Sequence, residues 1–162
     1  MKTTLLLGLA LLASTAHAEC GYRALAVEAE TPALYVGAGK RVQVEFDNYR
    51  LDGDVDRFPE PPMRIRQGGV SCRVDGGIWL RDGVYLDEAE KRLLVQSFSG
   101  SGGELSLYDT GNCAELSRVY LPEGRWALDG ERLLVGRQCA GEGIAGCAAR
   151  DVHVLDERCL PR

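Results

Sequence analysis

The chain has 162 residues, six cysteines and a formal net charge of −5, with 24 acidic against 19 basic residues. This length is enough for one domain with a hydrophobic core. The acidic balance argues against nucleic acid or an anionic membrane as a partner, because basic patches supply most of the affinity for both.

The first eighteen residues have the features of a secretory signal. Lys2 provides the positive start, residues 5–13 form an apolar run, and Ala16-His17-Ala18 provides a small-x-small cleavage site. The apolar run is too short to span a bilayer. We therefore expect residues 1–18 to be removed and residues 19–162 to form a single domain in the periplasm.

All six cysteines lie after the predicted cleavage site. An even number of cysteines in an exported chain predicts three disulfides, although the sequence allows 15 pairings. The nearest two could staple one hairpin, and the spacings do not resemble those of zinc ligands. No metal or cofactor is expected. The cysteines are Cys20, Cys72, Cys113, Cys139, Cys147 and Cys159.

Strand patterns dominate the first half of the domain. Residues 41–46 alternate between polar and apolar, and residues 63–65 begin another short strand. Between them, residues 47–62 are acidic and rich in proline. Asp52, Asp54 and Asp56 resemble the start of a calcium loop, but the later positions of that motif do not match. A solvated loop is favoured over a metal site or a contact to a basic partner.

Two apolar arms, residues 92–96 and 105–108, flank a loop of serine and glycine with the sequence SFSGSGG at residues 97–103. They predict two antiparallel strands with an irregular tip. Loops on rigid scaffolds often carry binding function, so we expect this tip to contact a partner protein. Phe98 either supports the loop from below or is an exposed anchor. The predicted partner-binding residues are Phe98, Ser99, Gly100, Ser101, Gly102 and Gly103.

Residues 86–113 and residues 128–159 contain a weak internal repeat, in which RLLV recurs at 92–95 and 132–135. A repeat of this size with several short strands in each unit is typical of propeller blades. Two or three units cannot close a ring. The predicted fold is therefore all-β, with antiparallel blade-like sheets in an open, propeller-like arrangement that disulfides hold together.

Catalysis has little support in this sequence. Ser101 lacks the glycine two positions earlier that a nucleophile elbow needs, since Ser99 occupies that place. A serine nucleophile also needs a base, and His153 is the only histidine after the predicted cleavage site. We expect His153 to be structural or exposed, and Trp79 and Trp126 to pack in the core or between the blades. The protein is not expected to be an enzyme.

Several separate motifs resemble one known family. They are FPEPP at residues 58–62, DGGIW at 75–79, FSGS at 98–101 and RWA at 125–127, together with the order of the six cysteines. In these motifs the chain is similar to the periplasmic immunity proteins that protect bacteria from type VI secreted peptidoglycan amidases of the NlpC/P60 type.

The resemblance implies an all-β inhibitor that pushes its serine-glycine loop into the substrate groove of a cognate Cys/His amidase. By position, Ser101 would hydrogen-bond the catalytic histidine of the amidase and block the cysteine nucleophile. The family has a second serine where this chain has Gly102. One polar contact would then be missing or replaced.

Two other readings stay open. A periplasmic structural or glycan-binding module would line a sugar-stacking face with Trp79, Trp126 and tyrosines. An inhibitor of another cell-wall hydrolase, such as lysozyme, would insert the same loop into the active-site cleft of a different enzyme.

Overall fold

The structure, a computed structural model, describes residues 20–50, 55–99 and 102–162. The predicted signal peptide lies outside these residues. In the described part of the chain the only helical element is a short 3-10 turn, η1 (Ile144–Gly146). The strands are β1 (Arg23–Ala24), β2 (Val27–Thr31), β3 (Leu34–Ala38), β4 (Val42–Asp47), β5 (Arg57–Pro59), β6 (Met63–Gln67), β7 (Val70–Val74), β8 (Ile78–Leu86), β9 (Arg92–Ser99), β10 (Gly102–Asp109), β11 (Glu115–Leu121), β12 (Trp126–Asp129), β13 (Arg132–Cys139) and β14 (Cys147–Val154).

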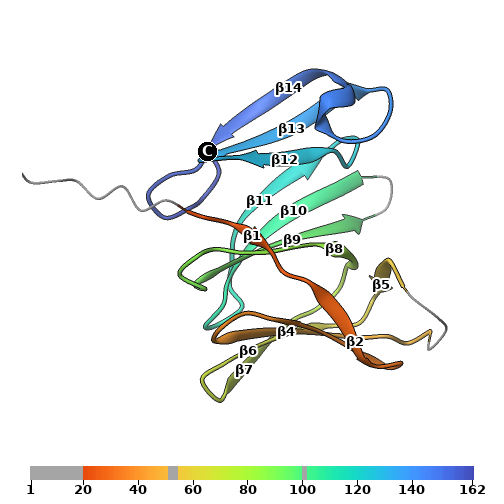
Figure 1. The fold of residues 1–162 in the computed structure, drawn as a ribbon, viewed down its shortest axis with the longest axis vertical. Coiled ribbons are helices and arrows are strands. Elements are labelled where there is room, and N and C mark those ends of the chain that lie inside the picture. Colours follow the sequence, from red (N-terminus) through yellow and green to blue (C-terminus); the bar gives the residue numbers. More distant parts are fainter. Residues whose placement is uncertain (1–19, 51–54, 100–101) are drawn as a thin grey trace, which may run out of the picture.

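These strands form three antiparallel sheets. The lower sheet in Figure 1 has the order β2-β3-β4-β6-β7, the middle sheet has the order β1-β8-β9-β10-β11 with β5 paired to β8, and the upper sheet has the order β12-β13-β14. Neighbouring strands are mostly consecutive in sequence, as in β-meanders. The predicted all-β class and antiparallel sheets are confirmed.

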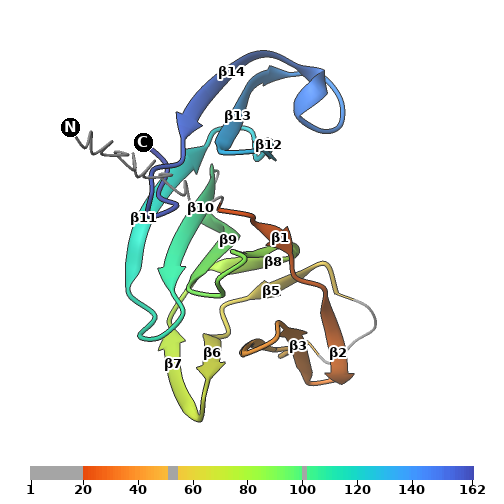
Figure 2. The same ribbon diagram turned by 60° about the vertical axis from the view of Figure 1, so that its left-hand side comes forward.

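The middle sheet is buried on both faces, and this explains the run of apolar residues in its strands. Leu93 and Val95 on β9 pack with the lower sheet in one core, whereas Leu94 packs with the upper sheet in a second core. Successive side chains of a strand point to opposite faces. The unbroken LLV of β9 therefore supplies both cores, and Figure 2 shows the three sheets as successive layers.

The internal repeat corresponds to two similar meanders. The RLLV sequences lie at the start of β9 and of β13, each as the central strand of three. Before them, Leu86 on β8 pairs with Leu93, and Leu128 on β12 pairs with Leu133. Each repeat is thus a three-stranded antiparallel unit of the kind that blades contain.

Part of the predicted solvated loop at residues 47–62 packs against the core. Phe58 is fully buried on β5 and stacks on Phe46 with ring centroids 4.8 Å apart. Val55 is also buried. The prediction relied on the acidic composition of the segment, whereas a single aromatic side chain is enough to anchor a polar segment to the core. Asp52 and Asp54 lie outside the described residues, and the remainder of the described chain holds no cluster of metal-ligating side chains.

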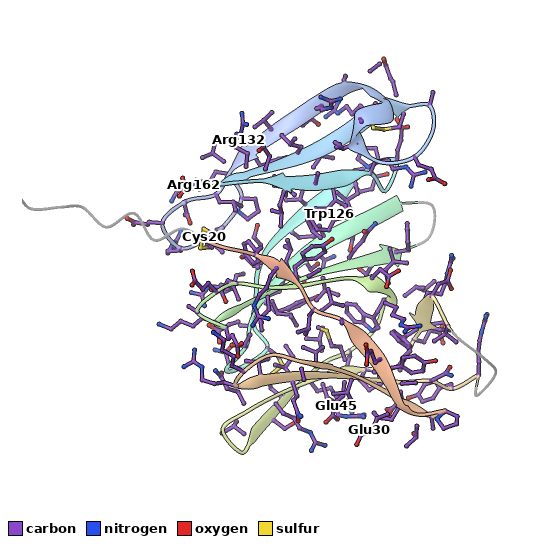
Figure 3. The ribbon with its side chains drawn as sticks, in the orientation of Figure 1. Cys20, Glu30, Glu45, Trp126, Arg132 and Arg162 are labelled. Atoms are coloured by element: carbon purple, nitrogen blue, oxygen red, sulfur yellow. A yellow bond between two sulfur atoms is a disulfide. The ribbon has the colours of Figure 1, made fainter. Side chains whose placement is uncertain are left out.

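The outer face of the lower sheet is charged. Glu45 lies between Arg64 and Arg66, with N···O distances of 3.0 and 2.8 Å, and Arg64 also pairs with Asp47 at 2.7 Å. Figure 3 shows Glu45 and Glu30 on this face, away from the core. The hydrogen bonds from Arg64 lower the pKa of Asp47. Because its charges are paired and face solvent, the outer face of the lower sheet does not require another sheet to cover it.

All six cysteines form disulfides, as predicted from their number. Cys139–Cys147 staples the β13–β14 hairpin, which confirms the one pairing suggested by spacing. Cys72–Cys113 joins the lower sheet to the middle sheet. Cys20–Cys159 closes a sequence separation of 139 residues and ties together the two ends of the described chain (Figure 3).

A buried carboxylate makes a second link between the lower and middle sheets. Glu90, in the turn between β8 and β9, is 1% exposed. It accepts hydrogen bonds from the backbone N–H groups of Lys40 (2.6 Å), Arg41 (2.7 Å) and Val42 (3.1 Å), and from the guanidinium of Arg23 (2.7 Å). One side chain thus fixes the β3–β4 turn against the middle sheet.

No helix in the described residues has the length and apolar character needed to cross a membrane.

Candidate functional site

The serine-glycine stretch forms the end of a long, regular hairpin. β9 and β10 pair without a break from Asp109↔Arg92 to Gly102↔Ser99. The strands extend further than the sequence predicted, so that only Gly100 and Ser101 connect them. These two residues and the side chain of Ser99 lie outside the described part of the structure. Five of the seven residues of the predicted tip therefore belong to the two strands.

Phe98 supports this hairpin on one face. Its side chain is half-buried, and its ring edge lies 3.4 Å from the position that a Cβ on Gly103 would occupy. The same ring lies 3.6 Å from the corresponding position on Gly124, in the β11–β12 turn. The ring thus fills the space between the hairpin and this turn. The supporting role considered for Phe98 fits these contacts better than a freely exposed anchor.

The opposite face at the hairpin end carries Tyr120 of β11. A Cβ on Gly102 would lie only 2.4 Å from Cε2 of Tyr120, so the ring lies directly across the glycine. Gly102 is buried although Tyr120 is 60% exposed. A side chain at position 102 would shift the exposed ring toward solvent. Sequence analysis missed Tyr120; the only signal was the polar-apolar alternation of β11, which places Arg118 and Tyr120 on one face.

A hydrogen-bonded network holds the arms of the hairpin against the upper sheet. Trp126 donates from Nε1 to Oε1 of Gln96 at 2.7 Å, and Gln96 donates from Nε2 to the carbonyl of Gly124 at 3.2 Å. The Trp126 ring also meets Tyr85 edge-on, with centroids 5.0 Å apart. Figure 3 shows Trp126 between the upper and middle sheets. The base of the hairpin is therefore fixed by contacts from two layers.

The disulfide-stapled end of the β13–β14 hairpin is fixed to the same turn. The carboxylate of Glu123 accepts hydrogen bonds from the backbone N–H groups of Gln138 at 2.5 Å and Cys139 at 2.8 Å. In Figure 1 this end lies on the same side of the molecule as the end of the β9–β10 hairpin. One edge of the protein thus presents several braced turns.

Ion pairs surround the exposed side of this edge. Arg118 contacts Glu115 at 2.6 Å and Glu104 at 3.1 Å. The hydrogen bonds that Arg118 donates to Glu115, together with the charges of Glu115 and Glu104, raise the pKa of Arg118 above its ordinary value despite partial burial. The charges near the hairpin are therefore already paired, which leaves Tyr120 as the large apolar group on this surface.

The two tryptophans do not form an exposed stacking surface. Trp79 is 2% exposed and donates from Nε1 to the carbonyl of Pro61 at 2.9 Å, and Trp126 is only half-exposed in the network with Gln96. The prediction that both tryptophans pack in the interior is confirmed. A sugar-binding face lined by these rings is not supported.

His153 lies on β14 opposite Leu133, in the upper sheet. The alternation predicted for this strand is present, but Val152 and Val154 are the exposed side chains and His153 is half-buried. The valines point outward because the upper sheet is the last layer and its far face meets solvent.

The molecule is an all-β protein with three disulfides and a braced hairpin at one edge. The family model described as "Immune protein Tsi1" matches residues 20–159. The chain is also 38% identical over 141 residues to "Immune protein Tsi1" of Pseudomonas aeruginosa strain PAO1, an alignment that covers 83% of this chain and 82% of the relative.

The chain belongs to the Tsi1 immune protein family. The resemblance to a family of immunity proteins, drawn from the sequence motifs, is thereby confirmed. Membership in this family indicates an inhibitor and not a catalyst, in agreement with the prediction from Ser101 and His153.

Proposed function

We propose that the protein binds a cognate peptidoglycan amidase, delivered by type VI secretion, and blocks its active site with the end of the β9–β10 hairpin. In this proposal Ser101 approaches the catalytic histidine of the amidase and covers its cysteine nucleophile. The complex protects the periplasm of the producing cell.

The observation that carries the proposal is the narrow, regular hairpin end. Ser99 pairs directly with Gly102, which leaves two connecting residues. A cleft that accepts a thin peptide stem admits only a narrow probe, and glycines let the backbone approach where side chains would clash. Such a probe suits the substrate groove of an enzyme that cleaves the peptide stems of the cell wall.

Bracing of the hairpin favours tight binding. Phe98 packs below the hairpin, and Gln96 connects the β9 arm to Trp126. Association costs less when the contacting segment is already ordered, because less conformational entropy is lost. A single serine hydroxyl, with one donor and two acceptor positions, can then contribute to a stable complex.

Three disulfides support a periplasmic location. Disulfides form and persist in oxidising compartments, of which the periplasm is one, and they are rare in the cytosol. The peptidoglycan that an amidase would attack lies in the same compartment. The predicted signal peptide at residues 1–18 would direct the chain there.

The proposal is tested with two substitutions of matched size and charge. Ser101→Arg places a bulky side chain at the hairpin end, and Val70→Arg places the same side chain at a 61% exposed position on β7 of the lower sheet. We expect Ser101→Arg to lower affinity for the amidase at least about tenfold, and Val70→Arg to inhibit like the unmodified protein. Full inhibition by folded Ser101→Arg would contradict insertion of the hairpin.

The smaller change Ser101→Ala tests the hydroxyl itself. It is expected to weaken binding by about 0.5–1.5 kcal/mol if the hydrogen bond joins neutral groups. Gly102 is less suitable for such a test, because a side chain there would meet the ring of Tyr120.

A further inference from the structure

Tyr120 is an exposed aromatic side chain at the base of the hairpin. Its relative exposure is 60%, which is high for a large apolar ring on a strand. It faces Glu104 across the β10–β11 pair, and Arg118 precedes it by two residues on the same face. Arg118 and Glu104 form an ion pair with each other, with an N···O distance of 3.1 Å. The ring is therefore the part of this surface available for a new apolar contact.

The ring lies against the backbone of the hairpin. The nearest atoms to a Cβ built on Gly102 are Cε2 of Tyr120 at 2.4 Å and its hydroxyl oxygen at 2.9 Å. The phenol thus reaches to the residue directly after Ser101. A group that meets the hairpin end would meet this hydroxyl as well, because both lie at the same end of β10.

A groove continues from the ring along the free edge of β11, which is the last strand of the middle sheet. Its volume is about 310 Å³, and it lies between β11 and the inner face of the upper sheet. The groove offers an aromatic rim and a floor of paired charges. Its lining includes Val119, Tyr120, Pro122, Arg137, Asp151 and His153.

We infer that Tyr120, seated on Gly102, is a second contact point for the effector, with the ring as an apolar anchor and the phenol hydroxyl as a polar contact beside the inserted hairpin end. This inference rests on the proposed function, because it assumes that the effector surrounds the hairpin. The occupant is the rim of the effector's substrate groove. The free edge of β11 lies next to that rim once the hairpin is inserted.

Tyrosine is suited to this role. Aromatic residues with a polar end are enriched among the few side chains that dominate protein interfaces. Tyrosine has only two side-chain torsions to fix on binding. Gly102 leaves room for the ring beside the hairpin end.

The test is a direct binding measurement with the effector, independent of its enzymatic activity. Tyr120→Ala is expected to lower affinity at least about tenfold, and Tyr120→Phe, which keeps the ring, about two- to tenfold. Tyr49→Ala is the matched control, because Tyr49 is equally exposed at 63% but follows β4 of the lower sheet. Unchanged affinity for Tyr120→Ala would overturn the inference.

Amide hydrogen exchange of the free variants separates contact from support. We expect the β9–β10 hairpin of Tyr120→Ala to exchange as in the unmodified protein, since Phe98 and Gln96 still hold its base. Faster exchange in step with the loss of affinity would show that Tyr120 acts only by ordering the hairpin, against the inference. If Ser101→Arg abolishes binding and Tyr120→Ala does not, the result supports insertion of the hairpin and contradicts the second contact at Tyr120. If Tyr120→Ala abolishes binding and Ser101→Arg does not, the hairpin proposal fails instead.

Discussion

Replacement of Glu90 by alanine should destabilise the fold by about 3–5 kcal/mol. The carboxylate is 1% exposed and is the shared acceptor for three backbone N–H groups and the guanidinium of Arg23. Its removal would take away the protein acceptor of all four donors and the link between the β3–β4 turn and the middle sheet.

The three backbone donors are not equivalent. The N–H of Val42 belongs to a fully buried residue, and a buried donor without an acceptor costs about 1–3 kcal/mol. Lys40 and Arg41 are exposed, so water can replace the carboxylate at their N–H groups, and about 1 kcal/mol each is lost. These contributions together give the expected magnitude.

The assay is urea unfolding near neutral pH, followed by tryptophan fluorescence with the disulfides intact. Glu88→Ala is the matched control, because Glu88 lies in the same turn but is exposed, and surface substitutions usually change stability by about 0.5 kcal/mol or less. A loss below about 1 kcal/mol for Glu90→Ala would refute the assignment of Glu90 as the link between the sheets.

The same link predicts a dependence on pH. Burial acts to raise the pKa of Glu90, but the hydrogen bonds from the three backbone N–H groups and the charge of Arg23 outweigh it, and the pKa is lowered overall. A depressed folded-state pKa means that the stabilisation is complete above the ordinary value of about 4.5 and is lost as pH falls below it. Glu90→Gln should flatten this acid limb of the stability profile.

Three further predictions concern other parts of the fold. Replacing Cys20 and Cys159 by alanine should cost about 2–5 kcal/mol, because their bond closes the longest loop; denaturation with an unchanged midpoint would contradict this. Trp126→Phe should cost about 1–3 kcal/mol by leaving the buried amide of Gln96 without its donor, and should speed amide exchange in the β9–β10 hairpin. Backbone N–H donors of the C-terminal turn are the main reason that the pKa of Asp156 is lowered to about 2. Asp156→Asn should therefore be less stable than the unmodified protein near neutral pH, and this difference in stability should vanish as pH falls from about 3.8 to about 2. A difference in stability that persists at the acid end would contradict this prediction.

Local patterns in the sequence were enough to predict the sheets. The alternation in residues 41–46 and the two RLLV repeats correspond to β4, β9 and β13, because strand periodicity depends on which faces are buried. The number of cysteines predicted three disulfides. The pairing of Cys20 with Cys159 was not predictable, since it depends on how distant strands stack.

Contacts between layers escaped the sequence analysis for the same reason. Glu90 lies in the polar turn DEAEK, where it looks like an ordinary solvated residue, and Phe58 lies in an acidic segment. Only the stacking of the lower sheet on the middle sheet buries them. Tyr120 was missed because its partner, Gly102, is eighteen residues away and has no side chain to suggest a contact.

The central claim is that the protein protects by binding and plugging a secreted cell-wall amidase. The direct measurement is a titration of the purified protein, with its disulfides formed, against such an amidase, with muropeptide cleavage and complex formation followed together. The account predicts a stable complex and loss of cleavage in proportion to the protein added, both lost in Ser101→Arg. Continued cleavage without a complex, for several amidases of the class, would contradict it.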